Sequence, residues 1–129
     1  MPEPGRSPFS YATIRVVPNL ERGEFVNAGV VLFCRSRRFL GVRVALDALR
    51  LAALAPDLAA EAVRPHLDAL VRIAGGDPTA GPIAALPASE RFGWMVAPSS
   101  TVIQPGAVHV GLCVDPADTL ERLFAELVS

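Results

Sequence analysis

The first third of the chain shows the hydrophobic patterns of three consecutive strands. In the segment 10–17 every second residue is small or aliphatic, which predicts a half-buried strand with Ala12, Ile14 and Val16 on one face. The segment 28–34 is apolar throughout, as is typical of a central strand that is covered on both faces. After a short polar loop, the segment 39–45 alternates again. Together these segments predict an N-terminal three-stranded antiparallel meander.

The pattern changes to a helical period after residue 46. Asp47 can cap a short helix that Pro56 ends. A second helical segment follows over 57–74, and Pro65 within it is expected to kink or split the helix. The region 75–88 is rich in Gly, Pro and Ala and is expected to form a loop.

The last part of the chain predicts further strands and the clearest helix. The patterns of residues 101–104 and 107–114 predict two strands. In the strand over 107–114, His109 and Cys113 share one face. Its other face holds Val108, Val110, Leu112 and Val114. Asp115 is a suitable N-cap for a C-terminal amphipathic helix. The apolar stripe of that helix consists of Leu120, Leu123, Phe124, Leu127 and Val128.

These elements predict an α+β fold. We expect an antiparallel sheet of four to five strands, with helices packed on one face and the amphipathic helix at the C-terminal end. A chain of 129 residues fits one domain. Residues 1–8, which are polar and rich in Pro and Gly, predict a flexible leader, and residues 9–129 a single domain.

Composition narrows the classes of protein to which the chain can belong. With 51% hydrophobic residues, the chain can form a substantial core, and its net charge of −1 argues against nucleic-acid binding, which normally needs a basic excess. No apolar run is long enough to span a bilayer. Cys34 and Cys113 are not at the spacing of metal ligands, and we expect neither a metal nor a cofactor. Unpaired cysteines suit a reducing compartment, so we expect a cytoplasmic protein.

The sequence has none of the common catalytic motifs, so whether the protein is an enzyme stays open. It contains no glycine-rich phosphate loop, no nucleophile elbow and no zinc-binding helix motif. The predicted strands place Arg15, Arg43 and His109 on the sheet face opposite the aliphatic one. Three such groups can bind an anion, or they can simply line the solvated side of the sheet.

The polar connection before the central strand is a second candidate site. The segment 19–27 contains Arg22, Glu24 and Asn27 next to a strand that is expected to be buried. Such a segment can be a binding loop, because loops carry many binding residues. It can equally be an ordinary solvated connection with local hydrogen bonds from its asparagines.

Two segments of the sequence resemble a known family. The strings YATIRVVPNLERGEFVNAGVVLFC and TVIQPGAVHVGLCVDPADTLERLF are similar to those of the bacterial domain-of-unknown-function family 3037 (DUF3037), and the resemblance extends from Tyr11 to Val128. It implies no activity, cofactor or catalytic residue. It does imply a short protein that is often encoded beside a HipA-like kinase, and therefore an accessory role.

Three functions follow as hypotheses. The first is a binding or accessory module that partners a HipA-like kinase. The second is a small enzyme that acts on an anionic metabolite through Arg15, Arg43 and His109. The third is a self-associating structural protein, in which an uncovered sheet face forms a homodimer.

Overall fold

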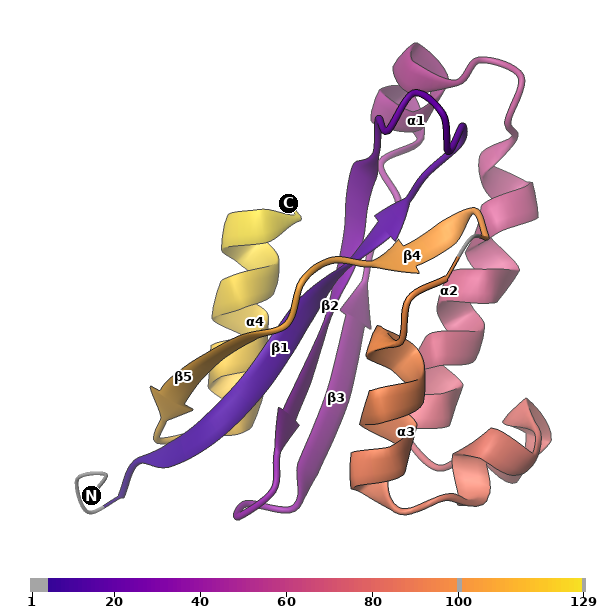
Figure 1. Ribbon diagram of the computed structural model, residues 1–129. Coiled ribbons are helices and arrows are strands. Elements are labelled where there is room, and N and C mark those ends of the chain that lie inside the picture. Colours follow the sequence, from indigo (N-terminus) through magenta and orange to yellow (C-terminus); the bar gives the residue numbers. More distant parts are fainter. Residues whose placement is uncertain (1–4, 100, 129) are drawn as a thin grey trace.

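The computed structural model describes residues 5–99 and 101–128 (Figure 1). Its strands are β1 (Ser7–Val16), β2 (Val26–Cys34), β3 (Phe39–Val44), β4 (Ile103–Pro105) and β5 (His109–Cys113). Its α-helices are α1 (Ala48–Leu54), α2 (Ala60–Ala74), α3 (Ala88–Val96) and α4 (Pro116–Leu127). Two short 3-10 helices, η1 (Pro78–Ala80) and η2 (Pro82–Ala85), lie in the segment that was expected to be a loop.

All five strands form one antiparallel sheet. The strand order is β3-β2-β1-β4, and β5 also pairs with β1. β4 pairs with the C-terminal half of β1 and β5 with its N-terminal half, so the two short strands share one edge of β1. The predicted α+β class, the antiparallel sheet with its N-terminal meander and the C-terminal helix are therefore confirmed.

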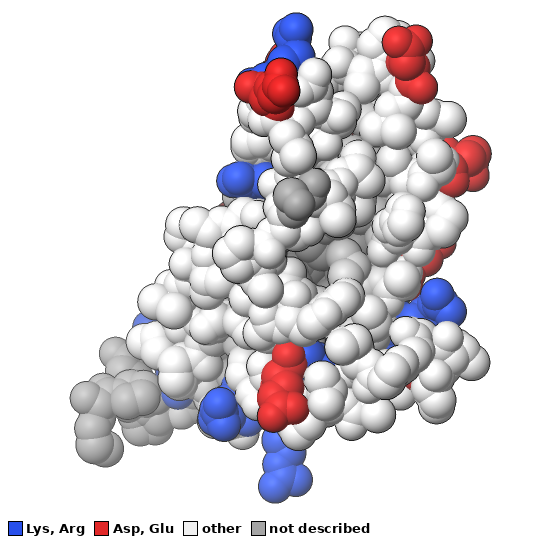
Figure 2. Space-filling model, turned by 45° about the vertical axis from the view of Figure 1, so that its right-hand side comes forward, with Lys and Arg blue, Asp and Glu red and all other residues white. Residues whose placement is uncertain are grey.

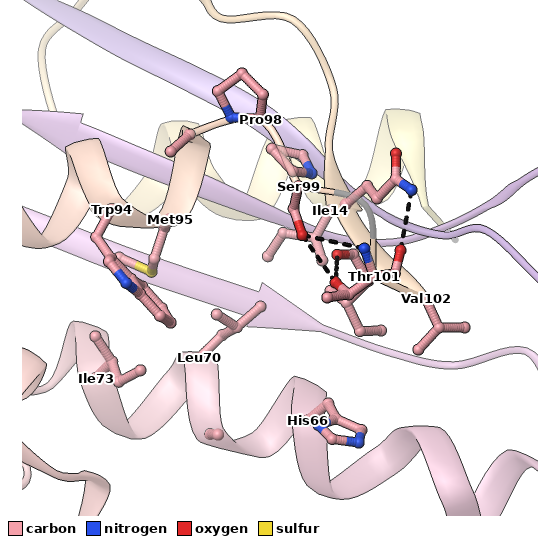
Figure 3. A pocket seen from close by; sticks show the side chains of 15 residues that line it. Ile14, His66, Leu70, Ile73, Trp94, Met95, Pro98, Ser99, Thr101 and Val102 are labelled. Atoms are coloured by element: carbon pink, nitrogen blue, oxygen red, sulfur yellow. Dashed lines mark hydrogen bonds between the residues drawn. The ribbon is translucent and has the colours of Figure 1, made fainter. Parts of the chain in front are cut away.

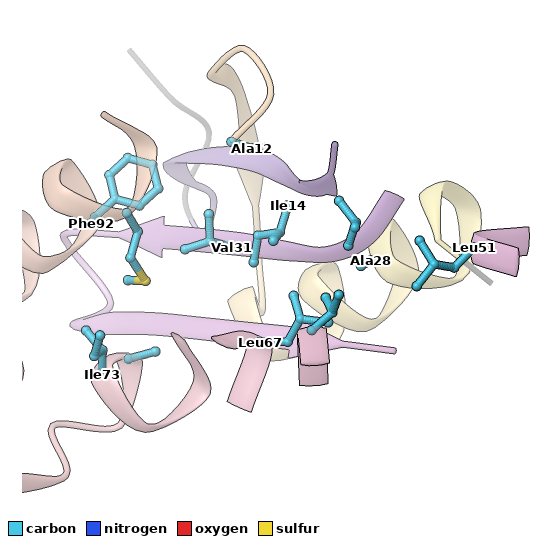
Figure 4. Packing of buried hydrophobic residues seen from close by; sticks show 12 residues of the cluster. Ala12, Ile14, Ala28, Val31, Leu51, Leu67, Ile73 and Phe92 are labelled. Atoms are coloured by element: carbon cyan, nitrogen blue, oxygen red, sulfur yellow. The ribbon is translucent and has the colours of Figure 1, made fainter. Parts of the chain in front are cut away.

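The central strand β2 is buried on both faces. Val31 belongs to a core cluster with Leu67 of α2 and Phe92 of α3 (Figure 4). Val30 and Leu32 belong to a second cluster with side chains of α4. All three β2 side chains are fully buried, as the continuous apolar run predicts.

Contrary to expectation, the helices cover both faces of the sheet rather than one. The layer of α2 and α3 packs on one face and α4 packs on the other (Figure 1). The reason is that β2 has apolar side chains on both faces, and each set requires its own cover. The Asp115 carboxylate accepts hydrogen bonds from the amides of Ala117 and Asp118, which starts α4 where its N-cap predicts.

A β-bulge changes the direction of the residues at the start of β2. Ile14 pairs with Gly29 and Arg15 pairs with Asn27, so Ala28 has no partner on β1. Ala28 therefore points into the cluster with α2, and Asn27 points towards α4. Gly29 is required here because an added Cβ would lie 2.8 Å from the carbonyl oxygen of Arg43.

Pro65 lies inside an unbroken helix, and the first strand begins earlier than the sequence pattern predicts. The helix over 60–74 is continuous and includes Pro65, so the proline does not split it. The expected leader overlaps β1, because Ser7 and Pro8 already pair with β5; residues 1–4 lie outside the described part of the chain. Within the described residues no helix combines the length and apolar character needed to cross a membrane.

We expect Leu32→Ala to lower the free energy of unfolding by about 2–5 kcal/mol, because the lost methyl groups leave a cavity between β2 and α4. Leu49→Ala is the matched control, since Leu49 is 84% exposed. Urea unfolding followed by circular dichroism measures both variants. Equal stability of the two would contradict the central role of β2.

Candidate functional site

The structure places Arg15 and Asn27 next to each other on the α4 side of the sheet. They are cross-strand partners on β1 and β2. The Asn27 side-chain amide donates a hydrogen bond to the carbonyl oxygen of Leu127 over 3.2 Å, which ties β2 to the last turn of α4. The Arg15 guanidinium lies 4.1 Å from the centre of the Phe25 ring, a cation–π contact. Two buried polar atoms, Arg15 Nε and Asn27 Oδ1, have no hydrogen-bond partner among the described residues.

Arg22 and Glu24 form a local ion pair in the connection between β1 and β2. Arg22 Nε donates a hydrogen bond to Glu24, and both side chains are exposed. This hydrogen bond, and then the charge of the carboxylate, raises the pKa of Arg22. Asn19 Oδ1 accepts from the amides of Glu21 and Arg22 and shapes the turn. The contacts are those of a well-formed solvated loop.

Arg43 is already engaged by α4. Its Nε lies 3.0 Å from Glu121 Oε1, and its guanidinium lies 4.6 Å from the centre of the Phe124 ring. The Glu121 carboxylate neutralises the positive charge of Arg43, which an anionic ligand would need for binding. Arg43 thus helps to hold α4 on β3.

Arg15, Arg43 and His109 lie on the same side of the sheet, yet they do not converge on one point. Across the strands, Thr13 of β1 pairs with Val30 of β2, which pairs with Arg43. Val30 is fully buried beneath α4 and separates Arg43 from β1. The His109 ring packs on Tyr11 with ring centres 5.3 Å apart, at the opposite edge. The alternation of residues predicts which sheet face a side chain lies on. It does not predict that Val30, buried beneath α4, separates Arg43 from Arg15.

The most unusual surface in the described structure is the outer face of β5 and its flanks. The predicted alternation is correct, but the aliphatic face points to solvent instead of into a core. Its side chains remain largely uncovered: Val108 is 45%, Val110 78%, Leu112 50% and Val114 63% exposed. We call these four residues the β5 stripe.

The opposite face of β5 fixes the strand firmly in place. Cys113 is buried in the cluster beneath α4, and burial raises the pKa of its thiol, to which the neighbouring Cys34 adds. An added Cβ on Gly111 would lie 2.8 Å from the Phe9 ring, so the glycine allows this ring to pack against β5. The β5 stripe is therefore exposed on an anchored strand.

The free edge of β5 has no acidic residue, arginine or proline that would hinder pairing with another strand. Within the described residues β5 pairs only with β1, so its outer backbone groups are open. The segment 106–114 contains no Asp, Glu, Arg or Pro. Natural edge strands generally carry such residues because an open apolar edge pairs readily with other chains. An exposed aliphatic row therefore lies beside an open strand edge.

Metal-ligating side chains do not gather at any point of the described structure. In residues 5–99 and 101–128, no group of three or more His, Cys, Asp or Glu side chains is placed to hold an ion. On the exposure of its side chains and the open strand edge, we take the β5 stripe and that edge as the candidate site.

Comparisons with known proteins give a family without an assigned activity. Residues 11–128 match a family model described as a protein of unknown function, DUF3037. Neither the curated proteins nor the solved structures gave a match.

We expect Asn27→Ala to lower the free energy of unfolding by about 0.5–1.5 kcal/mol, because α4 loses its side-chain hydrogen bond to β2. Glu24→Ala should leave stability unchanged, since its ion pair is exposed and screened by solvent. Urea unfolding of the two variants measures the difference. A larger loss in Glu24→Ala would show that the connection, and not the contact with α4, holds this end of the sheet.

Proposed function

The chain belongs to the DUF3037 family, and we propose that it is a binding module that holds a partner chain on the β5 stripe. One observation supports this proposal above all others. Four aliphatic side chains, exposed by 45–78%, lie in a row on an anchored edge strand that has no charge or proline. Complete burial of one such side chain is worth about 1.5–3 kcal/mol, so a partner that covers the row gains affinity from it.

The partner is expected to bring an apolar surface and, at the edge, a strand of its own. Addition of a strand would satisfy the open backbone groups of β5, while apolar side chains would cover the stripe. The resemblance described above makes a HipA-like kinase encoded nearby the first candidate. Cys34 and Cys113 are free and buried, which supports the reducing cytoplasm as the place of this association.

Self-association is the second candidate, and the same edge supports it. Two copies of β5 can pair antiparallel about a twofold axis, because such an interface uses the same surface twice. An enzyme acting on an anionic metabolite has less support, since Glu121 already neutralises Arg43 and Val30 separates it from Arg15.

We expect Val110→Lys to weaken the complex with the co-expressed HipA-like kinase by at least about tenfold, because the partner would have to bury an unpaired charge. Val110 is the most exposed member of the stripe, and lysine is a common edge residue, so the fold should tolerate the change. Leu49→Lys, on α1 at the other end of the sheet, is the matched control (Figure 1). Size-exclusion chromatography with light scattering measures the mass of each complex and of the chain alone.

The masses separate the two candidates. A complex with the kinase that is lost only in Val110→Lys supports the accessory role. A dimer of the chain alone that is lost only in Val110→Lys supports self-association. A monomer without a partner, or a complex that Val110→Lys leaves intact, would overturn the β5 stripe as the binding surface.

A further inference from the structure

A cavity lies on the other side of the molecule from α4, between α2, α3 and β4. Its volume is about 480 Å³, within the range of about 300–1,000 Å³ that is usual for small-molecule sites. Ile14, Ile73 and Met95 contribute to its wall, and each also belongs to the buried core. The cavity thus reaches from the surface into the main hydrophobic cluster.

The walls of this cavity are apolar and carry no Asp, Glu or Arg. Figure 2 shows the hollowed face, on which charged side chains lie mainly towards the periphery. Most polar side chains at the mouth bond to their own segment: Ser99 and Thr101 share a hydrogen bond, and Gln104 donates to the Thr101 carbonyl. A charged ligand would find no counter-charge here and would lose its hydration.

Two aromatic side chains face this space from different helices. Trp94 extends from α3 and is 48% exposed, and exposed His66 stands on α2 at the other end of the cavity (Figure 3). Among the described residues neither ring has a hydrogen-bond or ring partner, unlike Phe92 or Tyr11. The indole N–H and the imidazole are therefore available to a bound molecule.

From these observations we infer that the cavity binds an uncharged aromatic small molecule bearing a hydrogen-bonding group. The aromatic ring of the ligand would pack between Trp94 and the aliphatic wall formed by Leu70 and Ile73. His66 would form the hydrogen bond with the polar group. This site is separate from the β5 stripe and does not depend on the proposed function.

The test uses N-phenylnaphthylamine, an uncharged aromatic probe that becomes fluorescent in apolar sites. Trp94 is the only tryptophan in the chain, so a probe bound beside it should show energy transfer from tryptophan, and the cavity-filling variant described next places the bound probe in the cavity. The folded full-length chain should bind the probe and show transfer. No binding, or binding without transfer, would overturn the inference.

Filling the cavity should remove the site. Ala69 of α2 lines the cavity, and we expect Ala69→Phe to weaken probe binding about tenfold or more. Ala62→Phe is the matched control, because Ala62 lies on the same helix, is exposed and does not line the cavity. If Ala69→Phe fails to fold, Trp94→Leu replaces it, with the direct fluorescence of the probe as the readout. Unchanged affinity in the folded variant would exclude the cavity.

Competition defines the class of ligand. Naphthol should displace the probe at lower concentration than naphthalene, and His66→Leu should abolish that difference. Decanol should displace the probe poorly, since it has no ring to pack on Trp94. Equal displacement by naphthol and naphthalene would contradict the proposed class of ligand. Stronger displacement by decanol than by naphthol would contradict it as well. Val110→Lys should leave probe binding unchanged, which separates this test from that of the β5 stripe.

Discussion

Burial of β2 on both faces is the constraint on which the rest of the structure depends. Val30 and Leu32 require α4, whereas Val31 requires α2 and α3. Removing either layer would expose fully buried valines and leucines, at about 1.5–3 kcal/mol for each side chain. The two layers are therefore linked through the sheet, and β2 contributes fully buried side chains to both of them.

The bulge at Ala28 extends this arrangement to the end of the sheet. Without it, strict alternation would place Asn27 on the face of α2 and Ala28 on the face of α4. With it, the small Ala28 fits the tight core, and the Asn27 amide reaches the carbonyl of Leu127. The extra residue of the bulge thus directs the Asn27 side chain away from the apolar core. It directs it to the C-terminal end of α4, where carbonyl groups lack donors within the helix.

Local chemistry explains which features the sequence predicts. The Asp115 cap, the amphipathic helix that follows and the alternating strands are set by neighbouring residues, and they appear as expected. The bulge cannot be predicted, because an apolar run has no alternation that reveals a change of face. The exposure of Val110 cannot be predicted either, since an alternating strand has the same pattern whether or not a helix covers it. The cavity between α2, α3 and β4 depends on the spacing of distant segments, and its apolar residues resemble any other core residues.

The uncovered stripe and the cavity have a common origin in the dimensions of the elements. β1 has 10 residues and extends about 33 Å, whereas α2 with 15 residues is about 22 Å long and α3 with 9 residues is about 14 Å long. The layer of α2 and α3 therefore cannot cover the whole length of that sheet face. It packs over β2 and β3 and leaves the β5 end bare, and where it meets β4 the fit is loose enough to leave a cavity. The β5 stripe and the cavity, which we propose as binding sites, thus both lie where the layer of α2 and α3 ends.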